Sequence, residues 1–179
     1  IPTLVQNLEN VTQVSCGTNY TAVIANGNLY TFGDGHDGKL GHGNENSLNI
    51  PTLVQNLENV TQVSCDTNYT AVIANGKLYT FGYGNYGQLG HGNNTYFNIP
   101  TLVQNLENVT QVSCGDGHTA VISNGRLYTF GNGEYGQLGH GNNDKLTIPT
   151  LVQDLEYVIQ VSCGANYTAV ITLLSMQNL

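Results

Sequence analysis

A repeated segment of 49 residues constrains the fold of this 179-residue chain more than any other feature. The sequence IPTLVQNLENVTQVSC begins at Ile1 and returns at Ile50 and Ile99, and a variant of it, IPTLVQDLEYVIQVSC, begins at Ile148. A period of roughly 20–50 residues indicates a solenoid, a propeller or another repeat array. We therefore treat residues 1–179 as one domain made of repeats 1–49, 50–98 and 99–147 and a partial repeat 148–179.

Each copy contains four short stretches rich in apolar and β-branched residues, separated by Gly, Asn and Pro, which is the pattern of an all-β fold. In the first copy these stretches predict strands A, B, C and D over Val11–Cys16, Tyr20–Ala25, Leu29–Gly33 and Pro51–Gln55. The dipeptide Asn26-Gly27 between B and C favours a type I′ hairpin turn. Four antiparallel strands in every roughly 40–50 residues is the spacing of a β-propeller blade, so we expect a propeller.

Three motifs carry a family resemblance: C-G-x-x-[YH]-T-A-V-I, with Asp66 in place of the glycine in the second copy, then L-Y-T-F-G, then G-x-x-G-x-L-G-x-G. Together they closely resemble the regulator-of-chromosome-condensation repeat. Two departures from that repeat are a Tyr in the usual His place, except at His118, and a Phe where Trp is common; these residues are Tyr20, Tyr69 and Tyr167, and Phe32, Phe81 and Phe130. The resemblance implies a closed ring, usually of seven blades. It also implies one of several roles: guanine-nucleotide exchange on a small GTPase with docking on chromatin, enzyme inhibition, or a part in ubiquitin-ligase or photoreceptor proteins.

The chain holds only about 3.5–4 blades, so the ring must be completed by another chain or by further sequence. A stack of this length leaves apolar faces and unpaired strand edges at both ends. Two identical chains related by a two-fold axis would give eight blades, with residues 2–6 acting as strand D of a shared blade. That arrangement needs Leu173–Gln177 as a C strand, although the fourth copy lacks the Asn-Gly turn. Completion by a second copy, as a homo-oligomer, and completion by a longer chain both remain open.

The charge balance excludes several classes of partner. Four Lys and Arg against 12 Asp and Glu give a formal net charge of −8, which argues against direct binding of DNA or of an anionic membrane surface. No apolar run reaches the ~20 residues of a membrane span, and the first residues lack the pattern of a secretory signal. Together with unpaired cysteines, these features favour an intracellular location without indicating a compartment.

The copies differ mainly in the A–B and C–D loops, which successive antiparallel connections place on one face of the disc. Variable loops on a constant scaffold commonly form a specific binding surface. We therefore expect this face to bind a protein partner through aromatic and acidic side chains, and the carboxylates favour a basic one. The candidate residues are Asp34, Asp37, Asp66, Tyr83, Tyr86, Tyr96, Phe97, Asp116, His118, Glu134, Tyr135 and Asp144.

The remaining motifs have structural interpretations. Gly33-x-Gly35-x-x-Gly38 matches a dinucleotide-binding pattern, but no helix is expected after it, so we predict loop glycines with Leu40, Leu89 and Leu138 turned inward. The cysteines, Cys16, Cys65, Cys114 and Cys163, recur once per blade and diverge, so buried free thiols are expected rather than a zinc site. For His42, His91 and His140 we expect local hydrogen bonds.

No set of a nucleophile, an orienting base and an oxyanion site is present, so we expect neither an enzyme nor a cofactor or metal. The first functional hypothesis is a non-catalytic scaffold that binds a protein. The second, from the resemblance, is a regulator or exchange factor of a small GTPase, although the strict 49-residue period leaves no room for an inserted wedge. The third is a self-assembling structural building block.

Overall fold

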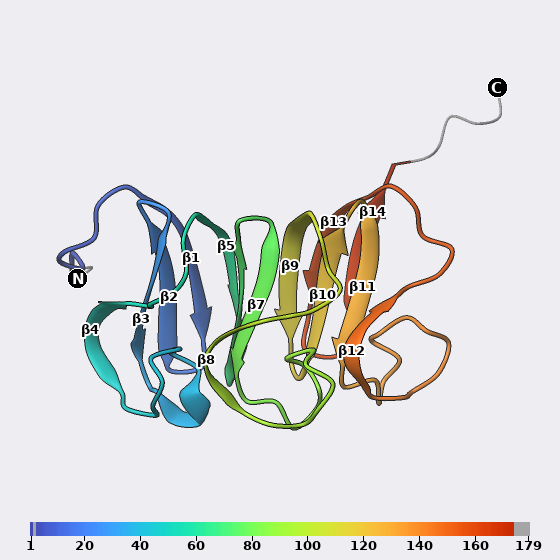
Figure 1. The fold of residues 1–179 in the computed structure, drawn as a ribbon, viewed down its shortest axis with the longest axis horizontal. Helices are drawn as coiled ribbons and strands as arrows, with labels where there is room; N and C mark the ends of the chain where they lie inside the picture. The colour runs from blue at the N-terminus through green and yellow to red at the C-terminus, as the bar shows by residue number, and fades with distance from the viewer. Residues whose placement is uncertain (2, 174–179) are drawn as a thin grey trace.

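Four antiparallel sheets stand side by side in the computed structural model, which describes residue 1 and residues 3–173 (Figure 1). The first sheet contains β1 (Val11–Gly17), β2 (Tyr20–Ala25), β3 (Asn28–Gly33) and β4 (Leu48–Leu53). The second contains β5 (Val60–Cys65), β6 (Tyr69–Ala74), β7 (Lys77–Gly82) and β8 (Phe97–Leu102). The third contains β9 (Val109–Gly115), β10 (His118–Ser123), β11 (Arg126–Gly131) and β12 (Leu146–Leu151), and the fourth β13 (Val158–Cys163) and β14 (Thr168–Thr172).

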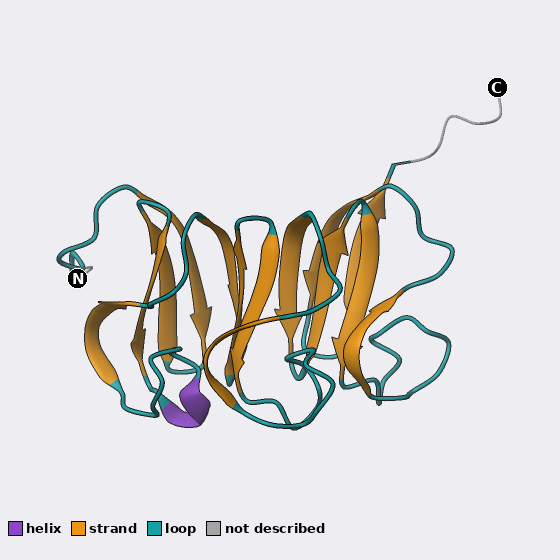
Figure 2. Ribbon diagram, viewed as in Figure 1, coloured by secondary structure: helices purple, strands orange, loops and turns teal. Residues whose placement is uncertain are grey.

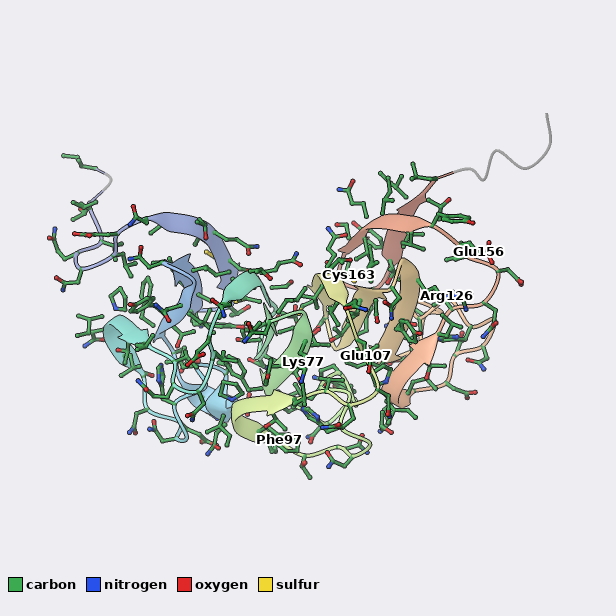
Figure 3. The ribbon with its side chains drawn as sticks, turned by 45° about the horizontal axis from the view of Figure 1, so that its top comes forward. Lys77, Phe97, Glu107, Arg126, Glu156 and Cys163 are labelled. Carbon is green, nitrogen blue, oxygen red and sulfur yellow. The ribbon has the colours of Figure 1, made fainter. Side chains whose placement is uncertain are left out.

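Strands pair in sequence order within every sheet, which confirms the predicted blades of an all-β propeller fold. Three blades are complete, and the fourth contains only strands A and B in the described part. Among the described residues, the one helical element is the 3-10 turn η1 (His36–Gly38) between β3 and β4, which is purple in Figure 2. The sheets form an open arc rather than a closed ring (Figure 3).

The Asn-Gly dipeptides form the tight B–C turns as predicted. Asn75 and Gly76 have φ values of 52° and 70°, and the other two pairs are alike. Each turn is also fixed by a side chain from the start of strand A: the Asn59 amide donates to Asn75 Oδ1 over 2.9 Å. Because both central residues have positive φ, the turn follows the twist of the strands it joins.

The position of strand D was predicted wrongly. The strand begins three residues earlier than expected, as β4 from Leu48 to Leu53 rather than Pro51–Gln55. Gly33 pairs with Leu48 and Thr31 with Thr52, and the register shifts between these pairs at a β-bulge. Because Pro51 has no N–H to donate, it fits at this irregular part of an edge strand, where the sequence pattern suggested a strand start.

The role expected for residues 2–6, as strand D of a blade shared with another chain, stays a prediction, because it needs a C strand from that chain. Residues 3–6 form no strand, since no C strand lies beside them in the described part of the chain. Leu173, the first residue of the expected fourth C strand, is not in a strand either, and residues 174–177 lie outside the described residues.

The core lies between neighbouring blades. Ala22 and Ile24 on β2 pack with Val63 on β5 and Phe81 on β7 in one cluster, and two equivalent clusters join the later blades. Every residue of β6 and β10 is buried, as expected for strands covered on both faces. Strand A is innermost and strand D outermost, so Cys163 lies inside the arc and Phe97 outside it (Figure 3).

The two ends of the stack are uncovered. Val14 on β1 is 59% exposed, whereas its equivalent Val63 on β5 is 2% exposed. At the other end, Tyr167 is 66% exposed, whereas its equivalent Tyr69 is fully buried. The apolar end faces expected from the sequence are therefore present. Among the described residues, no helix has the length and apolar character needed to cross a membrane.

Candidate functional site

The A–B loops and the C–D loops lie together on one face, which we call the loop face; it is at the bottom of Figure 1. Backbone hydrogen bonds join the two kinds of loop in each complete blade, and in the second blade Tyr83 N–H donates to Asn68 C=O over 2.9 Å. The opposite face carries the B–C turns and D–A connections and is called the turn face. Strand order places every candidate loop on the loop face, as predicted.

Three tyrosines of the second C–D loop form a cluster on the loop face. The rings of Tyr83 and Tyr96 meet edge to face with centroids 5.3 Å apart, and those of Tyr83 and Tyr86 lie 5.8 Å apart. Tyr86 is 46% exposed and Tyr96 is 49% exposed. The Asn85 amide donates to the Tyr96 hydroxyl over 3.3 Å, which holds the ring in place. The cluster is therefore both ordered and accessible.

Two carboxylates from A–B loops lie beside this cluster. Tyr86 packs against Gly117 of the next blade, since a Cβ on Gly117 would lie 3.0 Å from the Tyr86 ring. The Asp66 carboxylate lies near the Gly117 N–H, and Asp116 directly precedes Gly117. Partial burial, together with the nearby negative charge of Asp116, raises the pKa of Asp66 to about 6. A positive group arriving here would relieve the repulsion between the two carboxylates.

Other acidic candidates are already engaged within the chain. Asp34 Oδ2 lies 2.7 Å from Nζ of Lys39, whose side chain is buried, and this pair lowers the pKa of Asp34. Asp37 lies 3.2 Å from the His36 ring nitrogen. The sequence contained a signal for the first pair, because Lys39 replaces Gln88 and Gln137 in the only copy that carries Asp34.

The structure places the remaining candidates apart from the tyrosine cluster. Glu134, Tyr135 and Asp144 are exposed on the third C–D loop. Phe97 is half-buried on the outer strand β8, with its ring 4.5 Å from that of His91 (Figure 3). It therefore belongs to the edge of the blade rather than to the loop face.

His118 is fully buried and offers no surface to a partner. Its Nε2 lies 3.0 Å from Oγ1 of Thr168 in the next blade, and Thr168 donates its own hydroxyl proton to Gln137 C=O. The imidazole Nε2 must then be the donor, which leaves Nδ1 buried without a partner among the described residues. Burial lowers the pKa of His118 to about 4, so the ring is neutral and structural.

The motifs interpreted as structural behave as predicted. Thr80 donates to Leu89 C=O over 2.6 Å and lies 2.9 Å from His91 Nε2, and the other two complete blades repeat both contacts. Leu40, Leu89 and Leu138 are buried.

The cysteines are free, and burial raises the pKa of Cys65 to about 11. Cys16 is exposed, which corrects the expectation of burial, because no blade precedes β1. The described residues contain no group of three or more His, Cys, Asp or Glu side chains arranged to hold a metal ion.

Comparison with known proteins agrees with this architecture. The human X-linked retinitis pigmentosa GTPase regulator is 47% identical over 51 residues, which are 27% of this chain and 5% of that protein. The crystal structure of human WBSCR16 matches with a TM-score of 0.83 at 26% identity, covering 93% of this chain and 46% of that one. Prp20p from Saccharomyces cerevisiae gives a TM-score of 0.81 at 20% identity, covering 94% of this chain and 45% of that one.

The chain thus spans less than half the length of these matching structures. The sequence model described as the Regulator of chromosome condensation (RCC1) repeat matches residues 26–73, 75–122 and 124–171, and a second model of this repeat matches residues 109–137. The matched segments cover most of the chain, and each runs from strands C and D of one blade into strands A and B of the next. The chain therefore belongs to the family of proteins built from the regulator of chromosome condensation repeat.

Proposed function

We propose that this propeller segment is a non-catalytic protein-binding module whose loop face takes a partner with basic side chains. The observation that carries the proposal is the tyrosine cluster of Tyr83, Tyr86 and Tyr96 beside the carboxylates Asp66 and Asp116. Tyrosine rings attract a cation through their π faces, and they supply contact area with little loss of side-chain entropy. The carboxylates add charge complementarity, which favours a Lys or Arg side chain.

The test is binding of an arginine-rich peptide, with a glutamate-rich peptide of equal length as the negative probe. The chain has no Trp and 11 Tyr, so its intrinsic fluorescence reports directly on tyrosine environments. We expect binding of the basic peptide to weaken about fivefold to tenfold in Tyr86→Ala and in Asp116→Asn. Tyr157→Ala and Asp154→Asn change an exposed tyrosine and an exposed aspartate outside the loop face, and these controls should bind as the wild type does.

A pH series adds a second readout. Because the pKa of Asp66 is about 6, its carboxylate is largely ionised at pH 7.5 and largely protonated at pH 5. Binding of the basic peptide should therefore weaken on acidification through pH 6, and Asp66→Asn should flatten this dependence. Equal binding of both peptides, or equal loss in the loop-face variants and the controls, would contradict the proposal.

Regulation of a small GTPase is the second candidate, favoured by the 47% identical segment of a protein named as a GTPase regulator. Prp20p, which shares the fold, was described with its binding properties to Gsp1p and histones. The measurement is release of labelled nucleotide from a panel of small GTPases. No acceleration by the folded chain would remove exchange activity as its function.

A further inference from the structure

The turn face carries a pocket between the first and second blades, which we call the first turn-face pocket. Both of these blades are complete, with four strands each. The pocket has a volume of about 600 Å³ and is lined by residues 53–58 of the D–A connection and by Asn28, Ala74, Asn75 and Tyr79. Sites for small ligands commonly have volumes of roughly 300–1,000 Å³, so the pocket is large enough to hold one.

The D–A connection that lines the pocket is fixed by the blades on either side. Val54 N–H donates to Leu29 C=O over 2.9 Å, and the Val54 side chain is 1% exposed. Leu57 is also buried, whereas Glu58 is exposed. The pocket is therefore formed before a ligand arrives, which limits the entropy lost on binding.

The lining of this pocket suits a cation with an alkyl stem. Glu58 supplies a carboxylate, and no Lys, Arg or His is among the lining residues. The Asn28 amide donates to Asn26 C=O over 3.3 Å, which leaves Asn28 Oδ1 as an acceptor. Leu53 and the half-buried Tyr79 provide apolar surface. An arginine side chain matches this lining, because it combines an alkyl stem with five N–H donors.

The equivalent position between the second and third blades already contains a cation. Residues 102–107 repeat the sequence LVQNLE of residues 53–58, but Lys77 stands in place of Asn28. The chain thus brings its own positive charge to the side of the connection that carries Glu107. The first and second pockets therefore differ in charge although their connections are identical.

The third copy of this position also carries a cation. Arg126 lines one pocket together with Glu156. Figure 3, in which the turn face comes forward, labels this pair and the pair of Lys77 and Glu107. Neither pair forms a direct ion pair among the described residues, so each cation acts on its carboxylate through the local potential. Of the three equivalent positions, only Asn28 is uncharged.

We propose that the first turn-face pocket binds an arginine side chain of a protein partner, which supplies the cation that Lys77 and Arg126 supply elsewhere. The guanidinium group pairs with the Glu58 carboxylate and donates to Asn28 Oδ1, and its stem lies on the apolar lining. A peptide-borne arginine fits better than a free amino acid, because no lining residue has a positive charge to meet an α-carboxylate. The site lies opposite the loop face and is independent of the function proposed for that face.

The experiment titrates the 179-residue chain with N-acetyl-arginine methylamide and follows the backbone amides by NMR. We expect the amides of residues 53–58 to shift with a dissociation constant of about 1 mM. The citrulline derivative keeps the shape without the charge and should bind at least about fivefold more weakly. N-acetyl-arginine with a free carboxylate should also bind more weakly, which separates a peptide-borne arginine from an amino acid as the ligand.

Exchanging residues between the two pockets tests the role of the cation. Asn28→Lys places the lysine of the second pocket in the first and should abolish the shifts at residues 53–58. The reverse exchange, Lys77→Asn with Ser123→Ala, gives the second pocket the same lining residues as the first. It should add a second binding site, at residues 102–107. Both variants use residues that the chain already carries at the equivalent positions, so both should fold.

Glu58→Gln should weaken binding about fivefold, and Glu107→Gln is the matched control that should bind as the wild type does. Equal binding of the arginine and citrulline derivatives, or unchanged binding in Asn28→Lys, would overturn the proposal. So would the absence of shifts at residues 53–58 at about fifty times the expected dissociation constant. Shifts confined to the loop face would also overturn it, while supporting the tyrosine cluster as the site that binds arginine.

Discussion

One residue, His118, shows how a single change within a repeated pattern alters the chemistry of a blade. The other copies carry Tyr20, Tyr69 and Tyr167 at this position. The Tyr69 hydroxyl of the second blade donates to His118 C=O of the third blade over 2.5 Å. His118 instead reaches Thr168 through Nε2 and leaves Nδ1 without a partner in the described part of the chain. The substitution exchanges a satisfied hydroxyl for a buried, titratable ring.

His118→Tyr should therefore stabilise the chain, most of all at acidic pH. A buried imidazole whose pKa falls from 6.5 to about 4 favours folding above its unfolded pKa, and that stability is lost as pH falls from about 6.5 to 4. The loss amounts to roughly 3 kcal/mol, at 1.36 kcal/mol for each pKa unit. Urea denaturation at pH 7 and pH 4.5 should show a smaller difference in the free energy of unfolding for the variant.

Asp66 titrates in the same range with the opposite sign. Its raised pKa favours the protonated folded state, so its contribution to stability declines as pH rises from about 4 to 6. Because wild type and variant both contain Asp66, its effect cancels in their comparison. An equal acid sensitivity of His118→Tyr and wild type would show that His118 does not govern it.

At the scale of elements, the sequence predicted the parts that depend on local chemistry. Each Asn-Gly turn fixed a hairpin, and strands B and C lie within one residue of their expected bounds. Strand D was misplaced because its pairing is set by a bulge opposite Gly33, which no local pattern reveals. The loop face followed from strand order, but the burial of His118 did not, because burial depends on the next blade rather than on the residue's own loop.

The sequence predicted the candidate site only in part, as it did the fold. The chain pattern identified the loops that vary, and three of their tyrosines do form a cluster. The Lys39 that replaces Gln in the copy with Asp34 was a local signal of that ion pair. No comparable signal placed Asp66 beside the cluster, because the direction of its side chain is set by packing between blades.

The second prediction concerns a close packing contact made by glycines of the C–D loops. In the first and second blades, the C–D loop places a glycine against the Phe of the next blade, and a Cβ on Gly90 would lie 2.8 Å from the Phe130 ring. Gly139 has nearly the same φ, 77° against 79°, but its nearest neighbour would be Val152 at 3.6 Å. The two positions differ in the aromatic contact and share the backbone conformation.

Gly90→Ala should therefore destabilise the chain more than Gly139→Ala. Both variants carry the cost of positive φ, about 1 kcal/mol, and Gly90→Ala adds about 1–3 kcal/mol from overpacking against Phe130. Thermal or urea unfolding measures the difference between the two variants. If both lose the same stability, the glycine is required for its backbone conformation alone, and the contact with Phe130 has no energetic role.

At the scale of the whole molecule, the chain is a one-dimensional series of blades in which each contacts only its neighbours. The stability of such an array is approximately the sum of the stabilities of the blades and of the contacts between neighbouring blades, and the end units are the weakest. Here the end next to β14 is a two-stranded sheet, and isolated two-stranded sheets are only marginally stable in water. Its Val161 is joined to the third blade by the hydrogen bond from its N–H to Gln111 and by the buried cluster that it shares with Ile122.

Hydrogen exchange should therefore decrease in rate from the ends of the stack toward its centre. The amides of β13 and β14 should exchange at least about tenfold faster than those of β9 and β10, their equivalents in a complete blade. Uniform protection along the chain would contradict the series of separate blades.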